Sequence, residues 1–307
     1  MKSPNAGELE SRKKVTRMHK FMRTIGFSTY EKKKEMEELL AQLARQAKRV
    51  GSVVEKEGSL FCELRAEVAE DMGVAMAGEV TPDGKFYREY YYPYVINRET
   101  SSTAECSIQR HAERETYAGM LDDYRMGVSL IYYMENSMEY RMRLRNHESI
   151  HQKSVALTGL SCEGKILLPV LKTKWQTENS QQETKKRCRL IEAAKSGDEE
   201  AIETLTMEDM DLYSEVSQRI MTEDLYSVID TCFMPWGVEC DQYSVIGEIK
   251  RVETKTNRMT NEEIYNLQLE CNDVTFSVAI NQRDLLGEPA VGRRFKGTVW
   301  LQGTAQF

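Results

Sequence analysis

The chain has 307 residues, a length at which we expect about two domains. Hydrophobic residues make up 40% and charged residues 30%, which supports a packed core and excludes a disordered chain. Lys and Arg number 42 and Asp and Glu number 49, so the formal net charge is -7. This charge argues against a protein wrapped in nucleic acid or spread on an anionic membrane, because neither surface attracts a negative body.

The N-terminal part of the sequence predicts a polar lead followed by an α+β domain. Residues 1–17 are polar and show no periodicity, so we expect a disordered lead, with translation starting at either Met1 or Met18. The α+β domain is expected over residues 18–175. A helix is predicted over 31–50, because apolar residues recur there at spacings of three and four and so share one helix face. The residues of that face are Met36, Leu39, Leu40, Leu43, Ala47 and Val50.

After this helix the hydrophobic period changes to two, which indicates β-strands. Three strands joined by short turns, one of them at residues 81–84, form a predicted antiparallel meander. The predicted strands cover residues 60–68, 73–80 and 85–94. On the first of them, one face carries Leu60, Cys62, Leu64, Ala66 and Val68, and these alternate with Phe61, Glu63, Arg65 and Glu67. Weaker strands are expected near residues 103–109, 127–134, 153–160 and 165–172. We place a hairpin turn between the last two, at residues 161–164.

The middle of the chain, residues 181–232, is dominated by helix-forming residues. We expect three or four short helices there. Ser196 with Glu199, and Thr206 with Asp209, fit the spacing of a helix start, in which a hydroxyl residue is followed three positions later by an acid.

The last part, residues 243–307, returns to a clean alternation of apolar and polar residues. Strands are expected near residues 243–253, 265–271, 274–280 and 294–302. Asn272 and Asp273 form a two-residue loop of the kind found in hairpins. Four strands of this kind predict a small β-barrel-like domain, for which an oligonucleotide-binding (OB)-like barrel is one option. The expected fold class is therefore α+β: an N-terminal helix with an antiparallel sheet, a helical middle segment and a C-terminal barrel.

The sequence also indicates a compartment. It has no run of about 18 apolar residues that would predict a membrane span, and its N-terminus lacks the apolar core of a secretory signal. The seven cysteines are odd in number, and no two have the Cys-x-x-Cys spacing, so neither a disulfide framework nor a structural zinc site is favoured. We expect a cytoplasmic protein with reduced thiols and no cofactor.

Residues 147–151 match the zinc-hydrolase motif H-E-x-x-H. On a helix, His147 and His151 would share one face and bind zinc, while Glu148 would activate water. The surrounding Arg and Lys residues indicate a solvated surface instead, and no third ligand has a recognisable spacing. Residues 137–151 fit either a helix or a strand followed by a loop. We favour an exposed loop or helix end without metal, and a zinc-dependent hydrolase is an alternative.

The outer phase of the last predicted strand carries Arg294, Lys296 and Trp300. Two cations and a large aromatic ring could hold a phosphodiester backbone and stack a base, so these residues are candidate ligand-binding residues for single-stranded nucleic acid. We favour the other interpretation, in which Trp300 covers the helical segment or the N-terminal domain and the cations lie at the rim of that contact.

Several strings of the sequence resemble a known family. They are Met18-His19-Lys20-Phe21, Ile25-Gly26-Phe27-Ser28, Gly237-Val238-Glu239-Cys240-Asp241-Gln242-Tyr243, Leu285-Leu286-Gly287-Glu288-Pro289 and Gly292-Arg293-Arg294-Phe295-Lys296-Gly297. As a set, over about residues 18–307, they resemble the uncharacterised bacterial family known as domain of unknown function 3881. The resemblance implies a bacterial cytosolic protein with the architecture of that family. It implies no activity, cofactor or functional residue.

The charge is unevenly distributed along the chain. Residues 1–50 hold 13 Lys and Arg against six acids, whereas residues 181–232 hold six against 13. We expect the basic head to dock on the acidic helices, within the chain or between subunits, although it could instead bind a polyanion. The function we favour is a non-enzymatic binding or protein-interaction module with an unknown protein partner and no membrane contact. The alternatives are single-stranded nucleic-acid binding and zinc-dependent hydrolysis.

Overall fold

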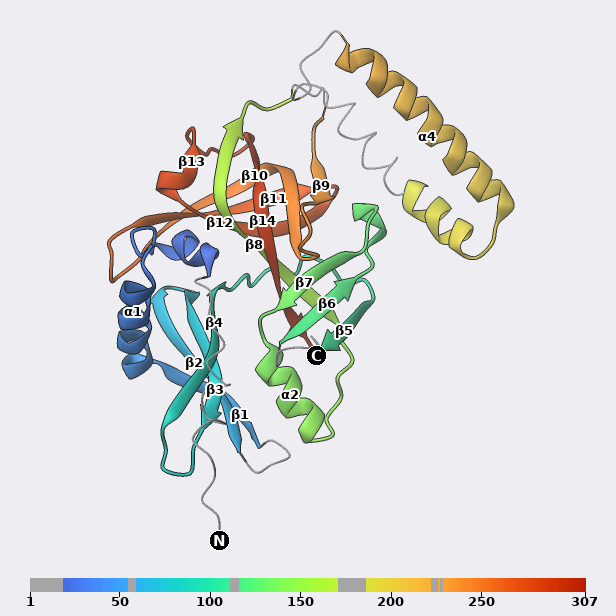
Figure 1. The fold of residues 1–307 in the computed structure, drawn as a ribbon. Helices are drawn as coiled ribbons and strands as arrows, with labels where there is room; N and C mark the ends of the chain where they lie inside the picture. Colours follow the sequence, from blue (N-terminus) through green and yellow to red (C-terminus); the bar gives the residue numbers. More distant parts are fainter. Residues whose placement is uncertain (1–18, 55–58, 111–115, 171–185, 222–225, 227–228) are drawn as a thin grey trace.

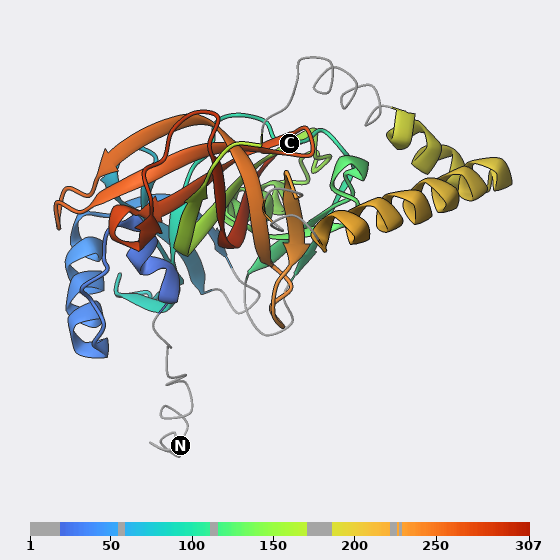
Figure 2. The same ribbon diagram turned by 90° about the horizontal axis from the view of Figure 1, so that it is seen from above.

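Two sheets form the body of the protein and a helical arm extends from it, as the computed structural model shows in two views (Figure 1 and Figure 2). The structure describes residues 19–54, 59–110, 116–170, 186–221, 226 and 229–307. The predicted disordered lead, residues 1–17, lies outside the described residues. Helices, strands and a closed barrel are all present, so the predicted α+β class is confirmed.

The N-terminal unit is a four-stranded antiparallel meander in the order β1-β2-β3-β4. Its strands are β1 (Lys48–Val54), β2 (Leu60–Ala69), β3 (Met72–Val80) and β4 (Phe86–Val95). The 3₁₀-helix η1 (Lys20–Ile25) and the helix α1 (Lys33–Gln46) precede it and share a buried apolar cluster with β3 and β4. The predicted turn is present: Gly84, with a φ of +82°, donates from its amide to the carbonyl of Thr81 at 2.8 Å.

The helix α1 buries Met36, Leu39, Leu40 and Leu43, as its periodicity predicts, but it ends at Gln46 rather than at residue 50. Residues 48–54 instead form β1 and pair with β2, and the side chain of Val50 is 51% exposed. The predicted last turn of this helix is therefore wrong. Antiparallel pairing with β2 gives hydrogen-bond partners to the backbone N–H and C=O groups of this segment. The segment also contains valines, and β-branched residues favour a strand over a helix end.

The larger sheet has ten strands, and five of them close into a barrel in the order β8-β12-β11-β10-β14, because β14 pairs with β8 as well as with β10. The barrel strands are β8 (Ser154–Leu167), β10 (Gln242–Thr256), β11 (Glu263–Cys271), β12 (Val274–Asn281) and β14 (Arg294–Gln306). The other strands are β5 (Cys106–Arg110), β6 (Tyr117–Leu121), β7 (Leu130–Met134), β9 (Cys232–Pro235) and β13 (Leu285–Leu286). The short helices of this part are η2 (Tyr124–Met126), α2 (Ser137–Arg145) and η3 (Gln282–Asp284).

The predicted hairpin at residues 161–164 is wrong, because β8 runs through this stretch as one continuous strand. Gly164 serves close packing rather than a turn: a Cβ atom there would come within 2.4 Å of the ring of Phe295 on the paired strand β14. The fifth strand of the barrel therefore comes from before the helical segment. The boundary we predict at residue 175 does not separate the barrel from the strands that precede it.

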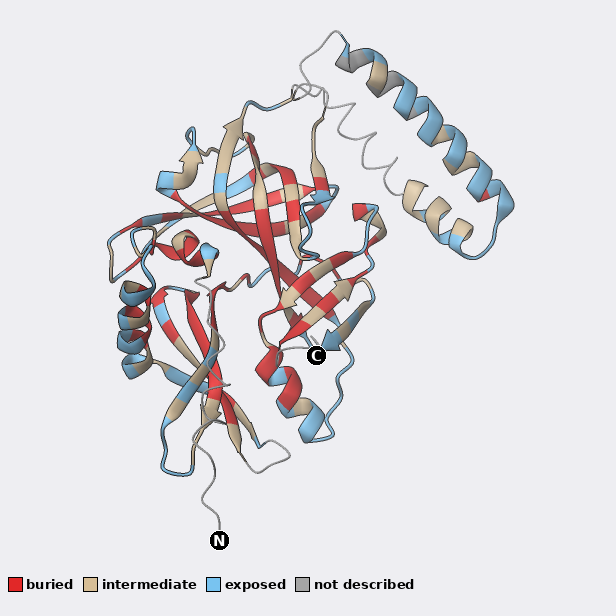
Figure 3. Ribbon diagram, viewed as in Figure 1, coloured by how far each residue is buried: buried red, intermediate tan, exposed pale blue. Residues whose placement is uncertain are grey.

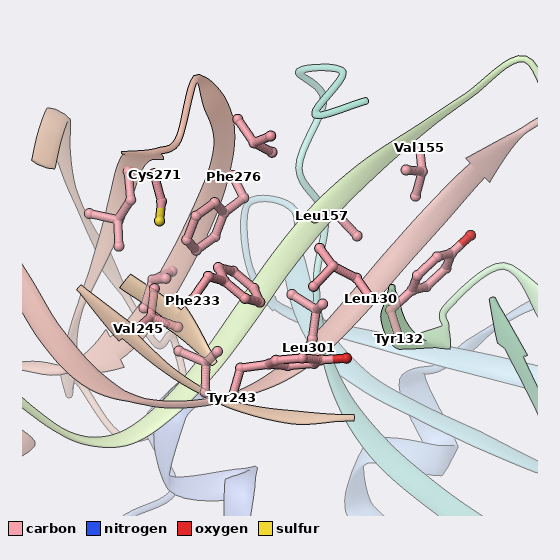
Figure 4. Packing of buried hydrophobic residues seen from close by; sticks show 14 of the residues in the cluster. Leu130, Tyr132, Val155, Leu157, Phe233, Tyr243, Val245, Cys271, Phe276 and Leu301 are labelled. Atoms are coloured by element: carbon pink, nitrogen blue, oxygen red, sulfur yellow. The ribbon is translucent and has the colours of Figure 1, made fainter. Parts of the chain in front are cut away.

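The barrel interior is filled by the residues that the alternation places on the inner phase. Leu267, Leu269, Cys271, Phe276 and Val278 are buried there, packed with Val245 and Phe233 (Figure 4). Asn272 and Asp273 join β11 to β12 with φ values of 51° and 60°, as the two-residue hairpin turn requires. The predicted barrel is thus confirmed, with a strand parallel to β12 supplied by β8.

The helical arm consists of a helix over residues 186–195 and the helix α4 (Glu199–Ile220). Gly197, with a φ of +89°, makes the break between them, and the carboxylate of Asp198 accepts bonds from the amides of Glu200 and Ala201 at the start of α4. The predicted helix start at Thr206 is wrong. Its hydroxyl donates to the carbonyl of Ile202 one turn back, inside a single 22-residue helix.

Among the described residues, no helix has both the length and the apolar character needed to cross a membrane. The basic head and the acidic arm lie at opposite ends of the body: α1 is beside the four-stranded sheet, and α4 extends away on the far side (Figure 1 and Figure 2). Residues 19–50 pack on their own sheet and on the barrel instead of on the arm. Among the described residues, the head therefore does not dock on the arm of its own chain, and docking between subunits stays a prediction.

Candidate functional site

The H-E-x-x-H match lies after a helix, not on one. The helix α2 ends at Arg145, and His147 has a φ of 54°, which is incompatible with a continuing helix. His147, Glu148 and His151 are all exposed, and the Glu148 carboxylate lies 3.7 Å from the guanidinium of Arg143. The helical spacing that would bring the two histidines onto one face does not apply in this loop. In the part of the chain that the structure describes, no group of three His, Cys, Asp or Glu residues is arranged to hold a metal.

Trp300, the aromatic residue of the candidate nucleic-acid surface, lies on the outer face of the barrel under the N-terminal segment. It is 5% exposed, and its ring lies 4.7 Å from that of His19, 5.3 Å from that of Phe21 and 5.2 Å from that of Tyr133, measured between ring centroids. Its indole nitrogen donates to the carboxylate of Asp241 at 2.7 Å. A base could stack on this ring only after the N-terminal segment moved away.

Arg294, the first candidate cation, anchors both ends of the helical arm to the barrel. It is 4% exposed, and burial lowers the pKa of its guanidinium. The guanidinium donates to the carbonyl of Leu168, which precedes the arm, at 3.0 Å. It also donates to the carbonyls of Tyr226 and Ile229, which follow the arm, at 2.7 and 2.6 Å. One planar side chain therefore joins the two chain segments that enter and leave the arm.

Lys296, the second candidate cation, lies beside this anchor. Lys296 faces Lys165 across the β14–β8 pair, and their ammonium groups lie 4.3 and 4.8 Å from the ring centroid of Tyr226. Lys296 also donates a hydrogen bond to the Tyr226 hydroxyl, which lowers the pKa of that hydroxyl. The structure thus brings Arg294 and Lys296 together at the base of the arm, and it places Trp300 in a different contact farther along the same strand.

The arm itself presents apolar side chains to solvent. The two helices are joined by ion pairs of Lys186 with Glu208 at 2.9 Å and of Arg187 with Asp209 at 2.6 Å. Among the described side chains of α4, four large apolar ones are exposed: Ile202 at 48%, Met207 at 61%, Met210 at 66% and Tyr213 at 76%. The exposed colour follows most of α4, whereas the sheets of the body are mainly buried (Figure 3).

A buried charge cluster that the sequence does not reveal joins the two sheets. The guanidinium of Arg65 bonds at 2.8 Å both to the carboxylate of Glu63 on the same strand and to that of Glu135, after β7. The Tyr92 hydroxyl donates to Glu63 at 3.1 Å, and the Thr304 hydroxyl donates to Glu135 at 3.2 Å. Burial raises the pKa of the Glu63 carboxyl despite the neighbouring Arg65. We call these five residues the seam cluster.

A cleft of about 410 Å³ lies where the N-terminal segment meets the barrel. Its lining residues are Thr29, Tyr30, Glu35, Met259, Thr260, Glu262 and Arg283. Its most buried polar groups are already bonded: the Glu262 carboxylate accepts bonds from Ser28 and Asn281, and the Thr260 hydroxyl donates to the carbonyl of Gly26. The polar groups inside the cleft are therefore engaged within the protein, and a ligand would find free hydrogen-bonding groups mainly at its exposed rim.

The fold defines an α+β protein in which a closed five-stranded barrel carries an antiparallel sheet on one side and a helical arm on the other. The chain belongs to the family described as "Domain of unknown function, E. rectale Gene description (DUF3881)", which it matches over residues 22–303. This is the family that its sequence strings resemble. No curated protein and no solved structure matches the chain.

Proposed function

We propose that this protein is a non-enzymatic protein-interaction module of the bacterial cytoplasm, and that the helical arm is its contact surface. The observation that carries the proposal is the exposure of Ile202, Met207, Met210 and Tyr213 within three turns of a helix that extends away from the body. Single exposed apolar residues are common on soluble proteins, whereas clustered ones mark contact sites. Burying such a patch against a partner removes apolar surface from water and so favours association.

The two alternative functions have less support. For single-stranded nucleic acid, Trp300 is covered, Arg294 is committed to backbone carbonyls, and the arm beside them is acidic. For a zinc hydrolase, His147 and His151 lie in an exposed loop without the helix that would align them. An interaction module requires neither site, and it accounts for an appended helix with an exposed apolar face.

Site-specific crosslinking tests the proposal. A photoreactive phenylalanine is placed at Tyr213 of the full-length protein in its native cell, and at Trp236 as a matched control, because Trp236 is an exposed aromatic residue of the body. We expect a protein crosslinked from position 213 and not from position 236, and we expect Met210→Asp to remove it. Equal crosslinking from both positions, or none from position 213, would contradict an interaction role for the arm.

A further inference from the structure

We infer that the exposed face of α4 binds a basic amphipathic helix of a partner protein; this rests on the proposed function and specifies the chemistry of the partner. The exposed face is the half of α4 that carries Ile202, Met207, Met210 and Tyr213 together with four exposed acids. Those acids are Glu199, Glu200, Glu203 and Asp211. At 100° per residue, all eight side chains fall within one half of the helix circumference.

Near the start of α4, the opposite half of the helix faces the companion helix. Ala201 is buried and Leu205 is half-buried on that side, and Glu208 forms its ion pair with Lys186 of the companion helix. The exposed face therefore points away from the companion helix. Its apolar residues are not needed to hold the arm together.

The charge of the exposed face selects the partner. Residues 199–213 contain no Lys or Arg, and four of their six acids belong to the exposed face. The other two, Glu208 and Asp209, are paired with Lys186 and Arg187 of the companion helix. A surface of this kind repels nucleic acid and anionic lipid, and it attracts Lys and Arg that border an apolar surface. The partner must therefore combine an apolar centre with a basic rim.

The geometry of α4 selects a helix as the bound form. An α-helix satisfies its own backbone hydrogen bonds, so α4 offers no strand edge to which an extended peptide could add. From Ile202 to Tyr213 the apolar positions span about 17 Å, or three turns, which a bound helix covers with anchors at i, i+4, i+7 and i+11. Two of the four anchors are methionines, whose flexible side chains adapt to different apolar partners.

Designed peptides test this inference with purified full-length protein. The probe is an 18-residue fluorescent peptide of Leu and Lys with helical periodicity. One control peptide has Glu in place of every Lys, and another has the Leu and Lys residues shuffled so that no apolar face forms. By fluorescence anisotropy we expect the periodic Lys peptide to bind at least tenfold more tightly than either control. We also expect its binding to weaken as salt screens the acids of α4.

Matched variants locate the binding. Met210→Asp places a charge within the exposed face, and Val238→Asp adds the same charge at a fully exposed residue of the body. We expect Met210→Asp to weaken the periodic Lys peptide about tenfold, the 1.4 kcal/mol of one lost apolar contact, and Val238→Asp to leave it unchanged. Likewise Glu203→Lys should weaken binding more than Glu288→Lys, a charge reversal at an exposed residue far along the chain.

The outcomes separate this inference from the proposed function. If the crosslink from Tyr213 is present but all three peptides bind equally, the arm contacts a partner of different chemistry and the basic-helix inference is wrong. If the Lys peptide binds equally to the Met210→Asp and Val238→Asp proteins, it binds elsewhere and the inference is also wrong. In a third outcome, no protein is crosslinked from position 213 in the cell, but the Lys peptide still binds at the exposed face. That result would overturn the proposed function, and it would leave the binding preference of α4 in place.

Discussion

The helical arm and the N-terminal sheet both contact the outer face of β14, but the arm does so through polar groups and the sheet mainly through aromatic rings. Along the outer face of β14, Arg294 and Lys296 hold the arm, whereas Trp300 and Gln302 hold the N-terminal sheet, the latter through a bond of 2.7 Å to the carbonyl of Pro93. The N-terminal contact buries aromatic rings and a charge cluster. Among the described residues, the arm contact consists of the bonds of Arg294 to backbone carbonyls and of lysine ammonium groups over the rings of Tyr226 and Tyr124.

The apolar contact with the N-terminal sheet stabilises the fold, whereas the polar contact at the arm only attaches a helix whose apolar side chains stay exposed. Burial of large apolar area, as around Trp300, is the main source of folding free energy, so the N-terminal sheet and the barrel should unfold together. Hydrogen bonds to backbone carbonyls contribute less, because the unfolded chain makes equivalent bonds to water. Because the arm contributes little to the free energy of folding of the body, its apolar side chains can stay exposed while the body remains stable.

The seam cluster provides the largest expected effect. Arg65→Met leaves the buried carboxylates of Glu63 and Glu135 without their cation, which should lower the free energy of unfolding by about 3–5 kcal/mol in urea titrations. The matched control is Arg251→Met. Arg251 also bridges two carboxylates, those of Glu99 and Glu253, but half of its side chain is exposed, so we expect a loss of about 0.5 kcal/mol. Equal losses in the two variants would mean that water reaches the seam.

Trp300→Ala should come next. Removing this ring opens a cavity between the barrel and the N-terminal segment and leaves Asp241 without its indole donor, at a cost of about 3 kcal/mol in the free energy of unfolding. Trp236→Ala, at an exposed tryptophan of the body, should cost less than about 0.5 kcal/mol. A small effect at Trp300 would show that the two sheets do not depend on this contact.

Arg294→Lys should loosen the arm without unfolding the body. A lysine cannot reproduce the planar set of bonds to Leu168, Tyr226 and Ile229, so we expect a loss of about 1–2 kcal/mol. Hydrogen exchange should accelerate around Ile229 and stay unchanged in the barrel strands. The control is Arg293→Lys, because the described contacts give the guanidinium of Arg293 a single hydrogen bond, to the nearby carbonyl of Glu288. Uniform acceleration throughout the barrel would contradict a local anchoring role.

The pH dependence of stability tests the environment of Glu63. Burial raises the pKa of its carboxyl in the folded protein above the ordinary value of 4.5, so the folded state holds this proton more tightly than the unfolded state. The contribution of Glu63 to the free energy of unfolding should therefore fall as the pH rises from about 4.5 through the raised value. Glu63→Gln should remove this part of the slope in urea titrations from acidic to neutral pH.

The control for that titration is Glu67→Gln, at an exposed position of the same strand. The slope measured for this variant is the reference against which the loss in the Glu63→Gln protein is judged. If the wild-type slope persisted in the Glu63→Gln protein, a different buried carboxyl would be the one that titrates.

His147→Gly should give the smallest effect and the opposite sign. A residue with a Cβ carries a strain of about 1–2 kcal/mol at the positive φ of this position, and glycine does not. Glycine adds about 0.5–1 kcal/mol of entropy to the unfolded chain, so the free energy of unfolding should rise by about 0.5 kcal/mol. His151→Gly, at a residue of the same loop with no positive φ, should give no gain. A clear loss of stability in the His147 variant would show that its imidazole makes a contact that matters.

Periodicity predicts elements well wherever one face of an element is buried and the other is not. Leu39 and Leu43 on α1, and Leu267 and Phe276 in the barrel, are buried as their spacing indicates. Glu63 and Arg65 are not described correctly by the same rule, because a second sheet covers the outer face of β2 and buries them. The alternation of apolar and polar residues indicates how polar each face of a strand is. It does not indicate whether a second sheet packs on the polar face and pairs its charged side chains.

The candidate site shows the same limit. Arg294 and Lys296 were identifiable as an outward row of cations, but their ligands are backbone carbonyls and a tyrosine from a distant part of the chain. No sequence pattern marks a carbonyl as an arginine ligand. The sequence also contains the apolar residues of α4, but it does not show which of them the companion helix covers. Only the position of that helix in the structure shows which side chains stay exposed to solvent.

The sequence by itself determined the local elements, the inner phase of the barrel strands, the helix start between Ser196 and Glu199, and the polarity between a basic head and an acidic arm. These features follow from neighbouring residues, which periodicity and turn chemistry describe. Only the tertiary structure decided that β8 closes the barrel, that Glu63, Arg65 and Glu135 meet at the seam, and that Arg294 holds the arm. Each of these depends on pairings between residues 65 or more positions apart, which local patterns do not encode.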